Sequence, residues 1–517
     1  MVPYNKNLEP NWQWTSSSSV QASIILDQPA NTIFTNLDEI SGRVILRCTK
    51  AVNITSIVVK LEGESRTRLL GQRTPGSYDK DDTKQTLETH KILYQVLSVF
   101  PPANVADARN AAKGVFTLPS GNHEYPFKFK IPFNNACFNS QPSLPGIQLN
   151  RSSLGLEMTR EPSRHVKQTL PPTLTGFPGE AEISYFVKTT IARQGLLKEN
   201  PRAFSPFSFL PIEPPRPPAT GEHRYARQKY DFSSAADATK KSKMKSLFSG
   251  ASSNGAIGDG QSLSVDIRLP EPPIITCNQA LPLSIVVKKL NGATGMLYMQ
   301  SLQVALVGYT KVTAHEFERL EQQNWVLLSR SNMQTPIGSA SDTADQEITL
   351  DSDLWRTTPL PTTIAPSFVT CNIQRYYQID VRIGLSYTGR AAGSKPQTVV
   401  LPFKLDTQVF SGIAPPAQVL SRMAAAKAQQ DNGKPTTPVI VDIPSTSSAT
   451  DAKLPLPDNK PAVAEPAHAP DSSFADAPPS YEDVIAADLP PVDGYRPAYA
   501  PPAAAQDNLL FRDEKHH

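Results

Sequence analysis

A proline- and tyrosine-containing motif in the last tenth of the chain has residue types and spacing suited to peptide recognition. It reads Pro478-Pro479-Ser480-Tyr481. Consecutive prolines favour the polyproline II helix, in which Tyr481 follows Pro478 by one three-residue turn and shares its face. Aromatic-lined grooves of WW domains accept this shape. We therefore predict that Pro478, Pro479 and Tyr481 contact a WW domain. The alternative is that the motif arises by chance among solvated tail residues.

A second, degenerate copy of the motif follows at Arg496-Pro497-Ala498-Tyr499. We predict Pro497 and Tyr499 as a second, weak contact. Two weak sites on one flexible tail would engage tandem WW domains with a gain from effective concentration.

A basic stretch, containing Lys240, Lys241, Lys243 and Lys245 and followed by Leu247-Phe248, has two interpretations. Lysines near an anionic membrane surface each contribute about 1 kcal/mol of binding free energy, and the two apolar residues would enter the bilayer. The plainer interpretation, which we favour, is a solvated charged loop.

Patterns for catalysis and metal binding are not found in the sequence. His315-Glu316 begins like a metalloprotease motif, but Arg319 stands where the second histidine is needed. The four cysteines, Cys48, Cys137, Cys277 and Cys371, form no CxxC pair, so we predict no zinc site. We expect no catalytic residue, no cofactor and no metal. Nucleic acid is not an expected partner either, because basic residues are not interleaved with aromatics.

Proline and charge separate a carboxy-terminal tail from the rest of the chain. Of the 49 prolines in 517 residues, 17 lie in residues 415–517, with eight Lys and Arg against fourteen Asp and Glu. Such a Pro/Ala-rich acidic segment cannot bury enough apolar surface to fold, so we predict a disordered tail over 413–517. A short helix is expected within it, over 416–431, because Pro416 precedes strong helix formers.

Strict alternation of apolar and polar residues predicts β-strands in the body. In the longest run the apolar side chains occupy every second position, namely Tyr377, Ile379, Val381, Ile383, Leu385 and Tyr387. A period of two buries one face of a strand and solvates the other, which is typical of antiparallel sandwiches. The predicted fold class is all-β, with two antiparallel β-sandwich domains in tandem.

Proline-rich and polar stretches predict the boundaries of these domains. After a flexible amino terminus we expect a first sandwich with a polar insertion, a Pro-rich connector with a basic flexible loop, and a second sandwich. The corresponding ranges are 1–19, 20–212 with the insertion near 138–178, 213–260 and 261–412. Because residues 1–14 lack the pattern of a secretory signal and no apolar run approaches ~18 residues, we expect a cytoplasmic protein.

Several strand sequences resemble those of the arrestin family. Residues 37–46 (LDEISGRVIL), 57–63 (IVVKLEG) and especially 121–132 (GNHEYPFKFKIP) resemble an arrestin-like N-domain. Residues 265–273 (VDIRLPEPP) and 371–377 (CNIQRYY) resemble parts of the C-domain. The resemblance covers roughly residues 20–412, and the Pro-Pro-x-Tyr tail makes the chain similar to α-arrestins of the fungal trafficking-adaptor type.

The resemblance implies a function that needs no catalytic residue in this chain. Such adaptors recruit a WW-domain HECT-type ubiquitin ligase to plasma-membrane transporters, permeases or receptors, whose cytosolic segments they bind, and promote ubiquitination and endocytosis. The protein would be cytoplasmic and recruited peripherally to the plasma membrane and endosomes, with Lys240, Lys241, Lys243 and Lys245 as candidate ubiquitin acceptors. The alternative is an arrestin-fold endosomal sorting or signalling scaffold that acts without a ligase.

Overall fold

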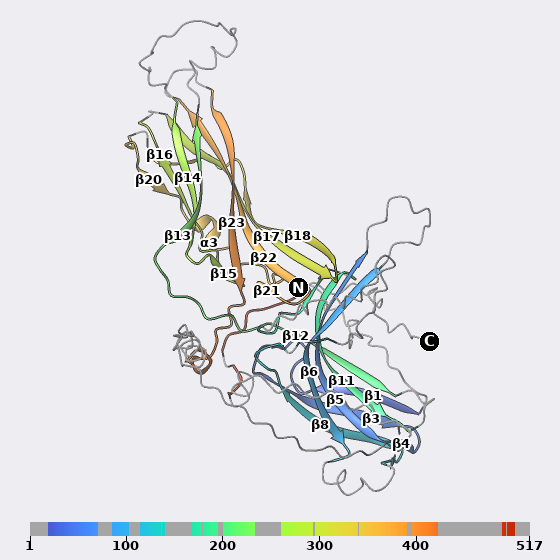
Figure 1. Cartoon of the computed structure of the whole chain (residues 1–517). Coiled ribbons are helices and arrows are strands. Elements are labelled where there is room, and N and C mark those ends of the chain that lie inside the picture. Colours follow the sequence, from blue (N-terminus) through green and yellow to red (C-terminus); the bar gives the residue numbers. More distant parts are fainter. Residues whose placement is uncertain are drawn as a thin grey trace, which may run out of the picture.

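Two β-sandwiches lie end to end in the computed structural model of the chain (Figure 1). Almost all of the regular structure is strand, so the predicted all-β class is confirmed. The structure describes residues 19–70, 85–102, 114–135, 137–139, 168–177, 179–194, 200–232, 260–292, 295–339, 341–389, 395–421, 489–492 and 494–501.

The first sandwich contains a three-stranded and a seven-stranded sheet. The smaller sheet has the order β1 (Val20–Leu26), β3 (Glu39–Cys48), β8 (Gly121–Lys130). The larger sheet has the order β2 (Ile33–Phe34), β12 (Arg202–Phe209), β11 (Ala181–Ala192), β5 (Ser56–Leu70), β6 (Gln85–Phe100), β9 (Phe138–Asn139), with β10 (Leu174–Phe177) paired to β11. A short ribbon of β4 (Val52–Ile54) and β7 (Phe116–Leu118) lies beside them.

The second sandwich is built in the same way from a four-stranded and a seven-stranded sheet. The smaller sheet has the order β13 (His223–Asp231), β14 (Ser262–Pro270), β16 (Ser284–Lys289), β20 (Glu347–Thr349). The larger has the order β15 (Ile274–Thr276), β23 (Gln397–Phe410), β22 (Ile373–Thr388), β17 (Met296–Ala314), β18 (Phe317–Arg330), with β19 (Thr335–Pro336) on β17 and β21 (Phe368–Val369) on β22. One helical turn, α3 (Asp353–Arg356), buries Trp355.

Alternation along the strands produces the two cores. In β11 buried and half-buried residues alternate over all twelve positions, as the sequence predicts for a strand with one apolar face. Tyr377, Ile379, Val381, Ile383, Leu385 and Tyr387 of β22 are all buried, as expected from their spacing. Each sandwich therefore has its own apolar interior, which fixes the register of its strands.

The ends of β17 and β22 join the second sandwich to the first. Val312 of β17 and Ile373 of β22 belong to the apolar cluster of the first sandwich. Polar groups hold the same contact: Asn372 donates to the carbonyl of Ser65 (3.1 Å), and the Thr67 hydroxyl donates to the carbonyl of Thr313 (2.6 Å). The two sandwiches thus share a packed and hydrogen-bonded interface.

Parts of the predicted connector and insertion are ordered strands. Residues 223–231, assigned from sequence to the connector and basic loop, form β13 at the edge of the second sandwich. The insertion predicted near 138–178 contains β9 and β10, while residues 140–167 lie outside the described residues. Residues 213–222, the start of the predicted connector, form neither helix nor strand.

The predicted tail is ordered where the structure describes it. Residues 417–421 are helical, which agrees with the start of the helix expected over 416–431, and residues 422–430 lie outside the described part. Residues 489–492 and 494–501 pack on the body, so the prediction of disorder is wrong for them. No helix within the described ranges is long and apolar enough to cross a bilayer.

Candidate functional site between the two sandwiches

A segment of the tail, residues 489–492 and 494–501, contacts both sandwiches, and we name it the tail strap. Its apolar side chains Leu489, Val492 and Tyr499 are buried in the apolar cluster of the first sandwich. Its backbone is held by the second sandwich, because Asn278 donates to the Ala498 carbonyl (2.9 Å). The tail strap therefore spans the junction between the two sandwiches.

Arg496 of the tail strap forms a two-pronged ion pair with a buried carboxylate of the first sandwich. Its Nη1 and Nη2 donate to Asp38 Oδ2 (2.6 Å) and Oδ1 (2.7 Å), and Nη1 also donates to the Ile33 carbonyl (2.9 Å). Asp38 is only 4% exposed. Parallel N–H···O bonds of this kind are strong and geometrically specific. Since a buried carboxylate without its cation is costly, this pair favours the docked tail strap.

A tight turn positions Asp38 for this pair. The Asp38 amide donates to the Thr35 carbonyl (3.3 Å), and the Thr35 amide donates back to Asp38 Oδ2 (2.8 Å). Leu37, between them, has a φ of 71°, which an L-residue adopts only where the surroundings demand it. The turn immediately precedes β3, so the carboxylate is fixed at the end of a core strand.

Tyr499 is the most deeply buried aromatic residue of the tail strap. Its side chain is 6% exposed, and its hydroxyl donates to the carbonyl of Thr173 beside β10. Burial raises the pKa of the Tyr499 hydroxyl, which therefore stays neutral. The next residue, Ala500, donates its amide to the carbonyl of Thr362 in the second sandwich (3.1 Å).

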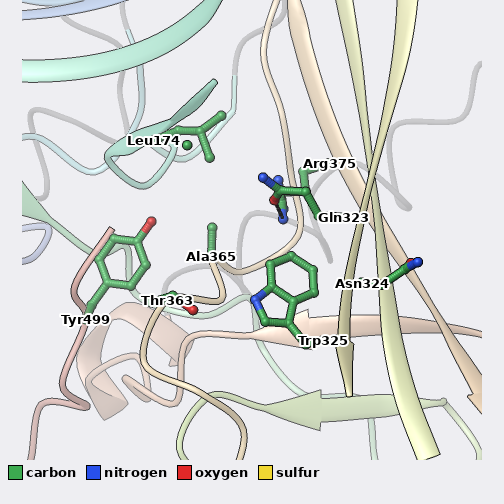
Figure 2. A pocket seen from close by; sticks show the side chains of 9 residues that line it. Leu174, Gln323, Asn324, Trp325, Thr363, Ala365, Arg375 and Tyr499 are labelled. Atoms are coloured by element: carbon green, nitrogen blue, oxygen red, sulfur yellow. Dashed lines mark hydrogen bonds between the residues drawn. The ribbon is translucent and has the colours of Figure 1, made fainter. Parts of the chain in front are cut away.

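Tyr499 also forms one wall of a cavity of about 260 Å³ at the junction (Figure 2). The wall residues come from β10, from β18, from the loop before β21, from β22 and from the tail strap, namely Leu174, Gly176, Gln323, Asn324, Trp325, Thr363, Ala365, Arg375 and Tyr499. No acid–base or nucleophile–base pair is found among these nine residues.

The guanidinium of Arg375 is the charged group of this cavity. It donates to Tyr377 Oη (2.7 Å), Thr310 Oγ1 (2.7 Å) and Gln323 Oε1 (2.9 Å). Its central carbon lies 5.3 Å from the ring centre of Trp325. Burial raises the pKa of Tyr377 to about 12, so this partner is neutral, as are the other two. A buried guanidinium held by neutral groups gives the cavity a positive potential, which favours a carboxylate, phosphate or carbonyl group.

The structure describes only some of the predicted site residues. Pro478, Pro479 and Tyr481 lie outside the described residues, as do Lys240, Lys241, Lys243 and Lys245. The second predicted ligase contact is buried, since Pro497 and Tyr499 face the body. In this conformation both side chains are covered, so a WW domain could contact them only after the tail strap undocks, and the second weak contact stays a prediction.

Sequence reasoning missed the ion pair between Arg496 and Asp38. The available signal was a lone arginine and two tyrosines, Tyr495 and Tyr499, within an acidic Pro/Ala-rich stretch that otherwise has little to bury. The partner is 458 positions away, and no local spacing points to it.

Comparison with known proteins explains the architecture of the first sandwich. Residues 22–147 match the family model of the arrestin (or S-antigen) N-terminal domain. The first sandwich therefore carries an arrestin-type N-terminal domain. This match supports the resemblance to fungal α-arrestins that the strand sequences carry, and strands β2 to β9 and most of β1 lie within the matched residues.

Curated proteins to which this chain is similar include several named arrestin-related trafficking adapter 10. The chain is 31% identical over 128 residues to that of Lachancea thermotolerans, covering 23% of this chain and 29% of the relative. It is 32% identical over 122 residues to that of Candida glabrata, covering 23% of this chain and 24% of the relative. It is 30% identical over 149 residues to that of Saccharomyces cerevisiae strain S288c, covering 26% of this chain and 27% of the relative. The matched stretch thus spans less than a third of each relative.

Proposed function

We propose that this protein is an α-arrestin trafficking adaptor that recruits a WW-domain HECT-type ubiquitin ligase to plasma-membrane transporters or permeases. Ubiquitination and endocytosis of the cargo would follow. The observation that carries the proposal is the joint presence, on one chain, of an arrestin N-terminal domain related to fungal trafficking adapters and a complete Pro-Pro-x-Tyr motif. The covalent chemistry would belong to the ligase, in keeping with a junction cavity whose walls hold no catalytic pair.

The ligase would bind at Pro478, Pro479 and Tyr481 alone. Polyproline II conformation leaves little entropy to lose on binding, and a single WW contact of this size gives micromolar affinity, roughly −7 to −8 kcal/mol. Glu482 and Asp483, directly after the tyrosine, would steer the motif toward a basic WW surface. Burial of Tyr499 supports a single site, because it removes the second copy from the solvent.

The tail strap would hold the ligase close to the body. Leu489 is buried on the first sandwich, and Lys130 at the end of β8 donates to its carbonyl. Tyr481 precedes Leu489 by eight positions. Eight residues reach at most about 29 Å, so a bound WW domain would lie within that distance of the first sandwich. A docked tail strap thus limits where the ligase is presented relative to bound cargo.

Cargo would bind to the body through its cytosolic segments, and the protein would be cytoplasmic with peripheral recruitment to the plasma membrane and endosomes. The junction cavity offers a positive, aromatic-lined recess for an acidic or carbonyl-bearing group of such a segment. Lys240, Lys241, Lys243 and Lys245 would act as ubiquitin acceptors or as contacts with anionic lipid.

Co-purification of the ligase with full-length variants tests this function. Tyr481→Ala removes the ring that fills the WW pocket, and we expect the ligase recovered and the cargo ubiquitinated to fall at least tenfold. Tyr495→Ala is the matched control, since Tyr495 is 79% exposed on the same tail and should leave both unchanged. Cargo that is still sorted normally by Tyr481→Ala would instead favour a scaffold that acts without a ligase.

A further inference from the structure

Three side chains with metal-binding atoms gather where β6 of the first sandwich meets the start of β22 of the second. They are His90, Cys137 and Cys371, and their ligand atoms all lie within 4.8 Å of one another. His90 Nδ1 is 3.2 Å from Cys137 Sγ, and Cys137 Sγ is 3.3 Å from Cys371 Sγ. Neither thiol is in a disulfide.

Both sandwiches contribute to this cluster. His90 lies in β6, and Cys137 directly precedes β9, which pairs with β6 through His90 and Asn139. Cys371 lies in the turn between β21 and β22 of the second sandwich. The pairing of β6 with β9 sets the first two ligands side by side, and the docking of the sandwiches supplies the third.

The spacing of the three atoms fits a tetrahedral zinc ion after a small expansion. Zinc binds thiolate sulfur at about 2.3 Å and imidazole nitrogen at about 2.0–2.1 Å, which sets sulfur–sulfur and sulfur–nitrogen edges of about 3.8 and 3.6 Å in a tetrahedron. The observed edges of 3.3 and 3.2 Å are each about half an ångström shorter. Zinc binding would therefore require the three ligand atoms to move apart by about half an ångström.

A carboxylate behind His90 orients the imidazole as a metal ligand. Glu88 Oε1 is 2.5 Å from His90 Nε2, and Glu88 Oε2 accepts from the backbone amide of His315 (2.5 Å) in the turn between β17 and β18. An ionised carboxylate only accepts, so it holds a proton on Nε2, and Nδ1 is left as the nitrogen that faces the thiols and that would bind a metal ion once its own proton is displaced. Metal-ligating histidines almost always have such a partner on their other nitrogen.

We propose that His90 Nδ1, Cys137 Sγ and Cys371 Sγ bind one zinc ion that links the two sandwiches. Two thiolates and an imidazole suit zinc and fit poorly with calcium or magnesium, which prefer oxygen ligands. Cys137 is half-buried whereas His90 and Cys371 are 5% and 9% exposed, so water would supply the fourth ligand from the Cys137 side. Nothing in the local spacing of the sequence predicts this site, because Cys137 and Cys371 are 234 positions apart.

The bound ion would fix the relative position of the sandwiches. Two of its ligands come from the first sandwich and one from the second, and the same junction holds the contact between Asn372 and Ser65. An ion that binds only the folded, docked form raises the melting temperature by mass action. Zinc is therefore expected to stabilise the full chain and to be released when the junction opens.

Zinc content of the reduced full-length protein after loading and dialysis tests the site. We expect about one zinc ion per chain for the wild type and for Cys48→Ala, whose cysteine lies in the first core at the far end of β3. Cys137→Ser combined with Cys371→Ser should retain less than about a tenth of this. Glu88→Gln should weaken zinc affinity by about 10–100-fold while keeping all three ligands.

A second measurement covers the case in which the double variant fails to fold. Cobalt added to the metal-free wild type should give thiolate-to-cobalt charge-transfer absorption in the near ultraviolet, and zinc should raise the melting temperature. The proposal is overturned if the wild type takes up no zinc, if the double variant retains it, or if a Cys137–Cys371 disulfide forms and the reduced protein binds no metal.

Discussion

The interiors of the two sandwiches and the junction between them are held by different forces. Inside each sandwich the contacts are apolar: Leu61 of the first and Val381 of the second are fully buried in clusters of aliphatic and aromatic side chains. At the junction the apolar contact is smaller. It is accompanied by hydrogen bonds, such as that between Asn372 and Ser65, and by ion pairs, such as that between Arg496 and Asp38. Apolar burial is non-directional, whereas hydrogen bonds require one geometry.

Because of this difference, the junction is the part of the molecule where the docking geometry is specific and can change. Each sandwich has its own apolar cluster, while the junction combines a few apolar contacts with polar pairs and the tail strap. Interfaces between domains resemble transient protein–protein interfaces and are more polar than cores. A change in one polar pair can therefore alter how the sandwiches and the tail strap dock without unfolding either core.

The largest effect is expected in a core. Leu61→Ala in β5 removes a side chain that is 0% exposed, and we expect the free energy of unfolding to fall by about 2–5 kcal/mol. Both the lost apolar burial and the cavity left behind contribute. Chemical denaturation of the full chain, followed by tyrosine and tryptophan fluorescence, measures this. A decrease in the free energy of unfolding of less than about 1 kcal/mol would contradict the proposed difference between the cores and the junction.

An intermediate and local effect is expected for the tail strap. Arg496→Ala leaves Asp38 buried without its cation, at a cost of about 1–3 kcal/mol that undocking of the strap relieves. Hydrogen exchange of residues 489–501 should accelerate, while exchange in β5 and β22 should not change.

The matched control for this variant is Tyr495→Ala, because Tyr495 is exposed and belongs to the same segment. Arg496→Lys should give a partial effect, since an ammonium group cannot make the two parallel bonds. Equal exchange of the segment in the wild type and in Arg496→Ala would show that the ion pair does not hold the strap.

The smallest effect is expected at the rim of the junction. Arg319 of β18 pairs with Glu180 beside β11 at 2.9 Å, but the two side chains are 52% and 37% exposed. Exposed pairs contribute about 0–1 kcal/mol, so Arg319→Ala should change the melting temperature by at most a degree or two. A loss of stability comparable with that of Leu61→Ala would mean that exposed ion pairs at its edge stabilise the junction, contrary to our account.

The strands that the sequence predicts correctly are those with one apolar face. In β22 every second side chain from Tyr377 to Tyr387 is apolar, and that face became the core of the second sandwich. Strand β13 was not recognised because it lies at a sheet edge and most of its side chains are exposed, so its residues lack apolar alternation. Its pairing with β14 supplies backbone hydrogen bonds that leave no such pattern.

Most of the candidate site could not be predicted because its residues meet only in three dimensions. Asp38 and Arg496 are separated by 458 positions, and Cys137 and Cys371 by 234. Tyr499 illustrates the converse case, since a short motif predicts a weak ligase contact at a ring that the fold buries. Local spacing identifies strands and linear motifs, whereas sites at a domain junction depend on how two separately folded units dock.

The stoichiometry of WW-domain binding tests the central claim most directly. The full chain has one complete motif, at Pro478, Pro479 and Tyr481, and a second, at Pro497 and Tyr499, that is buried. Calorimetric titration with an isolated WW domain of a HECT-type ligase should therefore give one site per chain with micromolar affinity, abolished by Tyr481→Ala and unchanged by Tyr499→Phe. Two sites per chain, or binding that survives Tyr481→Ala, would contradict the account.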